Sequence, residues 1–276
     1  MPCSAQSLSC TQNKRMQTAF FNYQQAKLCY HKIGKGSKIL LFFHGYGQHG
    51  KVFEENSRFL QDDYTCYLFD LFFHGQSEWP HGEDVLTKDF WQALIQAFLT
   101  EQQINRFSLA GFSLGGRFVF ATLETQAPYI DALYLMAPDG VKTNFWYNLA
   151  TYPTLFRKLF KRMILHPSSF YSIANVIYKL GLVDKGLIRF AESQMKTEEM
   201  RSRVYHSWVV FRVLLFDMRK IASLIKHHNI STSMILGKFD KVITVKNMQH
   251  LIKHLPQCKV VLLNTGHNGI ISQWKP

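Results

Sequence analysis

The sequence predicts an α/β fold in which a mostly parallel sheet of eight strands carries helices on both faces and one inserted helical segment. Three observations lead to this fold. Short apolar runs alternate with amphipathic stretches, a glycine-rich pentapeptide joins one such run directly to a helix, and a segment without strands interrupts the alternation after residue 140. Alternation of this kind is typical of βαβ units, whose parallel strands are buried on both faces.

The expected strands and helices follow from the spacing of apolar residues, which is continuous or alternating in strands and repeats every three to four residues in helices. Eight runs fit buried or half-buried strands, the first two as a hairpin: residues 18–24, 27–34, 38–45, 64–71, 105–111, 130–138, 231–237 and 258–264. Five stretches fit helices: residues 51–60, 86–103, 113–126, 218–228 and 244–255. In the stretch 86–103, for example, Phe90, Leu94, Ala97 and Phe98 form one apolar stripe.

The interrupting segment, residues 141–213, differs from its flanks in both pattern and charge. It contains twelve Lys and Arg against four Asp and Glu, and so supplies most of the formal net charge of +13. Pro153, Pro167 and Gly181 are expected to break it into separate helices. We therefore expect a disordered tail over 1–16, a core over 17–140 and 214–276, and a helical cap over 141–213.

Bulk composition narrows the class of protein. No apolar run approaches the roughly 20 residues that cross a bilayer, and the first 15 residues carry no stretch typical of a signal peptide, so a cytoplasmic protein is expected. The five cysteines form neither a CxxC motif nor a Cys/His cluster, so no metal site and no disulfide framework is expected. The basic charge comes with no nucleic-acid-binding module, and nucleic acid is not an expected partner.

The pentapeptide Gly111-Phe-Ser113-Leu-Gly115 has the form of a nucleophile elbow, a sharp turn that exposes a serine hydroxyl at the carboxyl end of a strand. Small residues must flank the serine, because larger side chains would collide where the backbone folds back. The helix that follows presents free N–H groups, which favour a developing negative charge.

A serine needs a base, and the base needs an acid that orients it. On strand–turn–helix sites of this kind the order along the chain is Ser, then Asp or Glu, then His. Asp240 and His267 each come just after an expected strand and fit that order, while Asp139 after an earlier strand is an alternative acid. The backbone N–H groups of Leu114 and Tyr46 are the candidate donors for an oxyanion.

Five segments together resemble the α/β-hydrolase family, in its branch of capped serine hydrolases that includes esterases and carbon–carbon-bond hydrolases: HGYG, DLFFHGQS, GFSLGG, GKFDKV and TGHN. The resemblance covers residues 17–269, implies the catalytic set Ser113, Asp240 and His267, and implies no metal or organic cofactor. One departure is Phe72-Phe73, where the family usually has Pro-Gly.

We expect a hydrolase that cleaves a carboxylic ester or lipid-like ester with a hydrophobic acyl or aryl group. The alternatives are cleavage of a carbon–carbon bond in a diketone-like acid, with Arg189 or Arg212 holding its carboxylate, and a binding protein of the same fold without turnover. His44 and Phe112 are further candidates for the substrate pocket, and His44 is also expected to hydrogen-bond within its own loop.

The stretch 144–166 of the interrupting segment interleaves bases with aromatic and aliphatic side chains, and part of it resembles a basic amphipathic helix. Phe156, Leu159, Phe160, Met163 and Ile164 are expected on one side, and four bases around them. A basic amphipathic helix of this kind can rest on an anionic membrane or attract an anionic substrate.

Overall fold

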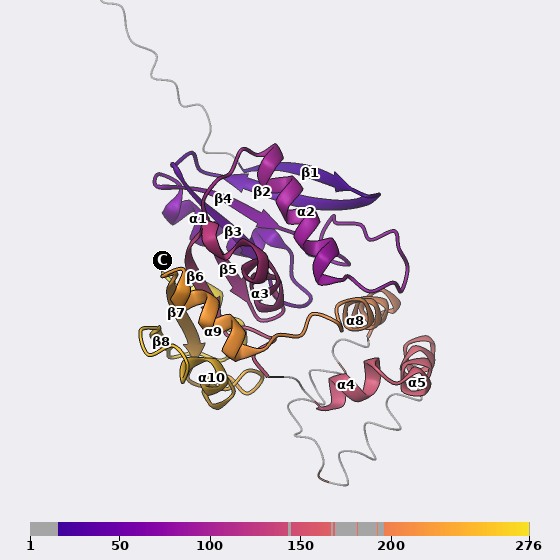
Figure 1. The fold of residues 1–276 in the computed structure, drawn as a ribbon. Coiled ribbons are helices and arrows are strands. Elements are labelled where there is room, and N and C mark those ends of the chain that lie inside the picture. The colour runs from indigo at the N-terminus through magenta and orange to yellow at the C-terminus, as the bar shows by residue number, and fades with distance from the viewer. Residues whose placement is uncertain are drawn as a thin grey trace, which may run out of the picture.

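The computed structural model describes residues 16–142, 145–166, 168, 181, 192 and 196–275, and these build one eight-stranded sheet with helices around it (Figure 1). The strands are β1 Gln17–Tyr23, β2 Ala26–Ile33, β3 Lys38–Phe43, β4 Tyr64–Phe69, β5 Phe107–Phe112, β6 Ile130–Met136, β7 Ser231–Gly237 and β8 Lys259–Leu263. Their order is β1-β2-β4-β3-β5-β6-β7-β8; β2 is antiparallel to both β1 and β4, and every other pair is parallel. The predicted fold class is confirmed.

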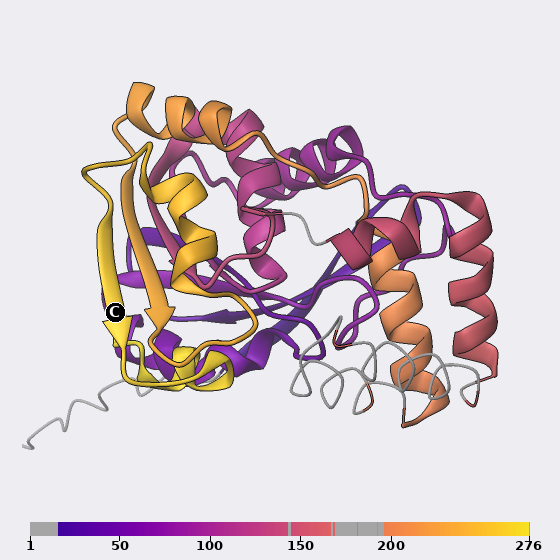
Figure 2. The same cartoon turned by 90° about the horizontal axis from the view of Figure 1, so that it is seen from below.

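Helices cover both faces of this sheet. The core helices are α1 Glu54–Leu60, α2 Lys88–Glu101, α3 Gly115–Gln126, α9 Met218–His227, α10 Val245–Ile252 and α11 Ile270–Gln273, with short 3₁₀ turns η1 Gly50–Phe53, η2 Ala127–Tyr129 and η3 His267–Gly269. On one face α2, α3, α9 and α10 pack in succession, whereas α1 and α11 touch each other on the opposite face (Figure 2). Side-chain N-caps start several of these helices; the Thr87 hydroxyl, for example, accepts the N–H of Phe90 at the start of α2.

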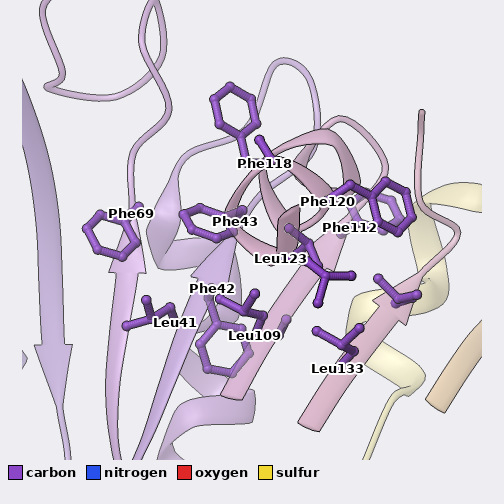
Figure 3. Close-up of a cluster of buried hydrophobic side chains, with 14 of the residues drawn as sticks. Leu41, Phe42, Phe43, Phe69, Leu109, Phe112, Phe118, Phe120, Leu123 and Leu133 are labelled. Atoms are coloured by element: carbon purple, nitrogen blue, oxygen red, sulfur yellow. The ribbon is translucent and has the colours of Figure 1, made fainter. Parts of the chain in front are cut away.

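Strand β3 shows why its apolar run is continuous. Successive side chains of a strand point to opposite faces, and both faces are covered here. Phe42 packs on Phe53 next to α1, while Phe43 stacks on Phe69 and meets Phe118 of α3 (Figure 3). All these rings are completely buried. The central strands therefore hold the ends of their loops in fixed positions.

Between β6 and α9 the chain forms three further described helices, α4 Phe145–Thr151, α5 Thr154–Leu165 and α8 Glu198–Val210, here called the insert helices. They pack on one another and share an apolar cluster separate from the main core: Phe160, Ile164, Val204, Tyr205 and Val209. Tyr46, from the loop after β3, packs against this cluster. The insert helices therefore lie over loops at the carboxyl ends of the strands.

The structure corrects one expectation about α5. Phe160 and Ile164 are buried, but Phe156 and Leu159 are exposed and do not share their side. The helix has two apolar stripes, so periodicity alone could not separate them. Pro153 directly precedes α5, as expected, and Gly181 has a φ of +67°, whereas Pro167 lies outside the described residues, as do residues 1–15 of the expected tail. Among the described helices none is long and apolar enough to span a membrane.

Candidate active site

Ser113 lies in the turn between β5 and α3 with a φ of +50°. A left-handed backbone costs a residue with a Cβ about 1–2 kcal/mol, so the surroundings must hold it there. Three backbone hydrogen bonds do this. The Ser113 N–H donates to the carbonyl of Met136 (3.0 Å), and the Ser113 carbonyl accepts the N–H groups of Gly116 and Asp139 (2.8 Å each). The end of β6 thereby fixes the elbow.

The flanking glycines of the elbow are required by close backbone approaches. A Cβ on Gly115 would lie 2.0 Å from the carbonyl oxygen of Phe43, at the end of β3. A Cβ on Gly111 would lie 2.6 Å from Cγ2 of Val119 in α3. The absence of side chains lets α3 begin against the oxyanion loop, here defined as residues 44–50.

His267 and Asp240 complete a hydrogen-bonded chain with Ser113. His267 begins η3 after β8, and its Nε2 lies 3.0 Å from the Ser113 Oγ, while its Nδ1 lies 2.6 Å from Oδ2 of Asp240. With the ring proton on Nδ1, the imidazole donates to the carboxylate and accepts from the hydroxyl. The other oxygen of Asp240 accepts the N–H groups of Val242 and Ile243 (2.8 Å each), so the completely buried carboxylate has a fixed orientation.

The alternative acid, Asp139, makes a different set of contacts. Its Oδ2 lies 2.6 Å from Nε of Arg117, and its Oδ1 accepts the N–H of Gly140 (2.7 Å). Burial alone would lower the pKa of Arg117, but the charge of Asp139 raises that pKa above its usual value. Arg117 also donates to the hydroxyl of Tyr147 (3.1 Å), which donates to the carbonyl of Trp208 (3.1 Å). Asp139 thus belongs to a link between α3, α4 and α8.

The two candidate oxyanion donors lie in neighbouring turns. Within the part of the chain that the structure describes, neither the Tyr46 N–H nor the Leu114 N–H donates to a protein acceptor. His44 shapes the loop that holds Tyr46: its Nδ1 donates to the carbonyl of Gly45 (2.7 Å) and its Nε2 accepts the N–H of Leu71 (2.9 Å). Burial lowers the pKa of His44 to about 4, so this ring is neutral.

The four residues predicted to line a substrate pocket are His44, Phe112, Arg189 and Arg212. His44 has both ring nitrogens engaged inside its loop, and Phe112 is buried with its ring 4.8 Å from that of His267. Arg212 donates to the carbonyl of Val209, within the turn that ends α8. Arg189 lies outside the described residues.

Two residues near the site make contacts that the sequence analysis did not anticipate. Arg117 is a buried cation in the first turn of α3, and its signal was the one basic residue in the stretch 113–126. Phe73 has a φ of +67°, and its ring stacks on His206 of α8 (5.4 Å) and meets Phe211 (5.9 Å). At the place where the family usually has Pro-Gly, this chain therefore contacts an insert helix through an aromatic side chain.

One cluster of described residues has the composition of a metal site. Cys29, His31 and Asp70 are buried with their ligand atoms within 4.8 Å of one another. Burial, together with the charge of Asp70, raises the pKa of the Cys29 thiol to about 12, which opposes the thiolate that a metal needs. Both oxygens of Asp70 already accept backbone N–H groups, from Gly50 and Gln76. The carboxylate therefore has a structural role, because it holds two loops in place.

The order of the strands, with helices on both faces of the sheet, is that of an α/β-hydrolase. A family model of the alpha/beta hydrolase fold matches residues 38–273, which is most of the chain, and the chain belongs to this family. The resemblance stated from the sequence is thereby confirmed.

Individual relatives are distant. The chain is 22% identical to human monoacylglycerol lipase ABHD6 over 271 residues, which cover 94% of this chain and 79% of that protein. It is 32% identical over 89 residues to the pimeloyl-[acyl-carrier protein] methyl ester esterase of Vibrio parahaemolyticus, an alignment that spans only 32% of either chain. Among solved structures, a hydrolase from Pseudomonas aeruginosa has a TM-score of 0.66 at 17% identity, with 93% of each chain covered. The meta-cleavage product hydrolase CumD has a TM-score of 0.61 at 19% identity, with 92% of this chain and 93% of that chain covered. At these identities the solved structures are similar in fold alone.

Proposed function

We propose that this protein is a serine esterase that hydrolyses carboxylic esters through an acyl-enzyme. The observation that carries the proposal is the continuous chain from Ser113 Oγ through His267 to Asp240, with distances of 3.0 and 2.6 Å. A serine hydroxyl beside an imidazole that a carboxylate orients is the arrangement that nucleophilic catalysis requires.

The reaction proceeds in two steps. His267 takes the hydroxyl proton as Ser113 attacks the ester carbonyl, and the N–H groups of Tyr46 and Leu114 bind the resulting oxyanion. When the tetrahedral intermediate collapses, the bond to the alcohol breaks and His267 protonates the leaving oxygen. Water then loses a proton to the same imidazole, attacks the acyl-enzyme and releases the carboxylic acid and free Ser113.

A hydrophobic acyl or aryl group is the substrate class we favour. The contacts that join the insert helices to the oxyanion loop and to the loop after β4 are mainly aromatic and aliphatic, as with Tyr46 on the cluster of Phe160 and Val204, and Phe73 on Phe211. Surroundings of this composition suit apolar ligands. The two relatives found by sequence are named as an esterase and a monoacylglycerol lipase, which agrees with an ester bond.

The test is labelling with a fluorophosphonate, followed by mapping of the adduct by peptide mass. We expect labelling at Ser113, loss of labelling in Ser113→Ala and His267→Ala, and full labelling in Ser223→Ala, which removes an exposed hydroxyl of α9. Hydrolysis of aryl esters with increasing acyl length should then favour the longer chains. A folded wild-type protein that neither reacts with the probe nor hydrolyses any ester would contradict the proposal, and faster cleavage of a vinylogous diketone would replace the ester by a carbon–carbon bond.

A further inference from the structure

Helix α5 exposes an apolar face that no described part of the protein covers. Phe160 and Ile164 account for its buried face, which packs in the cluster with α8. Four large apolar side chains lie on the rest of the helix with relative exposures of 76, 41, 43 and 63%: Leu155, Phe156, Leu159 and Leu165. Exposed apolar groups gathered on one helix are uncommon on monomeric proteins and are typical of an interaction surface.

Basic side chains are interleaved with this exposed face. Lys158 and Arg162 are exposed and lie one turn apart beside Leu159, and α5 contains no acidic residue. Lys161 pairs with Glu83 of the core (2.5 Å), but no carboxylate of the described chain pairs with Lys158 or Arg162. The face therefore offers aliphatic and aromatic groups together with unneutralised positive charge.

The position of α5 leaves this face uncovered by the part of the chain that the structure describes. Figures 1 and 2 both place α5 at the periphery of the molecule, and in Figure 2 α8 lies between it and the sheet. Next to its first residue, an open and mainly apolar depression extends the surface, lined by Asn148, Leu149, Tyr152, Pro153 and Leu215.

We propose that α5 docks the protein on the surface of an anionic lipid bilayer. The docking face is made of Leu155, Phe156, Lys158, Leu159, Arg162 and Leu165. Its apolar side chains would enter the boundary between headgroups and acyl chains, while the two bases meet lipid phosphates, the combination by which amphipathic helices bind membranes. A nucleic acid would use the charges but would leave the four apolar groups in water.

The docking face and the candidate active site lie on opposite sides of one layer of helices. Phe160 and Ile164, on the inner side of α5, belong to the cluster against which Tyr46 of the oxyanion loop packs. Docking through the outer side would therefore bring the bilayer close to the insert that borders the site. Vesicle binding does not need the reaction, so Ser113→Ala should bind vesicles as the wild type does, and the two proposals can fail separately.

The test is flotation of the full-length protein with vesicles of phosphatidylcholine, with and without phosphatidylglycerol. We expect binding to the anionic vesicles that weakens as salt is added. Lys158→Gln/Arg162→Gln should weaken binding by about 30-fold, since each base near an anionic surface contributes about fivefold. Leu155→Gln/Leu159→Gln, which keeps every charge, should weaken it by about tenfold or more.

The matched control is Lys246→Gln/Lys253→Gln, at one position in α10 and one directly after it, which removes the same charge from exposed positions away from α5. It should weaken binding far less than the pair in α5. Equal losses in the two charge pairs would overturn the proposal, because overall charge would then explain the binding. Absence of binding to anionic vesicles would overturn it as well, as would wild-type binding by Leu155→Gln/Leu159→Gln. Circular dichroism of each variant checks that these exposed substitutions leave the fold intact.

Discussion

The two acids that follow strands, Asp240 and Asp139, should fail in different ways when each is changed to Asn. In Asp240→Asn the amide faces the His267 Nδ1 across 2.6 Å and favours the tautomer with its proton on Nε2. That tautomer cannot accept the Ser113 proton, and an Asp→Asn change of this kind lowers kcat by about 10⁴-fold in a serine triad. The amide carbonyl can still accept the N–H groups of the loop, so we expect little loss of stability.

Asp139→Asn should instead destabilise the fold and spare the chemistry. Removal of one partner from a buried ion pair costs about 3–5 kcal/mol. The Asp139 side chain is 32% exposed, the amide keeps an acceptor, and the Tyr147 hydroxyl still accepts from Arg117, so about 2 kcal/mol is the expected loss. For a chain of this size that is a fall in Tm of roughly 3–4 °C.

The assay measures the rate of fluorophosphonate labelling and the Tm of both variants. The reasoning predicts slow labelling with a nearly unchanged Tm for Asp240→Asn, and nearly normal labelling with a lower Tm for Asp139→Asn. The opposite pattern, with labelling abolished only in a folded Asp139→Asn protein, would refute it and make Asp139 the acid of the site.

Three further outcomes follow from the same geometry. Burial lowers the pKa of His44 to about 4 and, with the added effect of His44, that of His74 to about 3, whereas unfolded histidines titrate near 6.5. Below pH 6.5 the unfolded state binds more protons than the folded state, so the free energy of unfolding falls as the pH is lowered toward 4, by about 1.4 kcal/mol per pH unit for each ring. In His74→Gln, the free energy of unfolding measured in urea should depend less steeply on pH, by the equivalent of about one proton. An unchanged pH dependence would contradict the assignment. Gly115→Ala places a Cβ 2.0 Å from the Phe43 carbonyl oxygen, and we expect a loss of about 3 kcal/mol or more in chemical denaturation together with slower labelling; a wild-type midpoint would show that the turn can relax. Tyr147→Phe removes the hydroxyl that joins α4 to α8, and we expect the free energy of unfolding to fall by about 1–2 kcal/mol in the same assay. An unchanged free energy of unfolding would mean that this hydrogen bond does not stabilise the fold.

The strands and the elbow could be predicted from the sequence because their signals are local. An apolar run such as residues 38–43 requires a strand covered on both faces, and the glycines around Ser113 are needed by backbone contacts of the turn itself. Asp240 and His267 each come directly after an apolar run, which predicts that both lie at strand ends. In the structure His267 is within hydrogen-bonding distance of both Ser113 and Asp240.

Features that depend on distant partners could not be predicted in this way. Asp139 and Asp240 both follow strands, and what separates them is Arg117, a buried cation that reaches only Asp139. The two apolar stripes of α5 are equally periodic, and only the packing of α8 decides that Phe160 is buried while Leu159 is exposed. Likewise, the contact of Phe73 with His206 joins segments far apart in the chain.

The topology has a consequence for how such a protein can change over time. Strands β6 and β7 are parallel neighbours, and the insert helices belong to the connection between them. The insert helices follow the carboxyl end of β6, and the chain returns to the sheet through α9, so the insert is not part of the strands whose ends carry Ser113, Asp240 and His267. Substitution or exchange of the insert can therefore change the surroundings of Ser113 while the hydrogen-bonded chain of Ser113, His267 and Asp240 is kept.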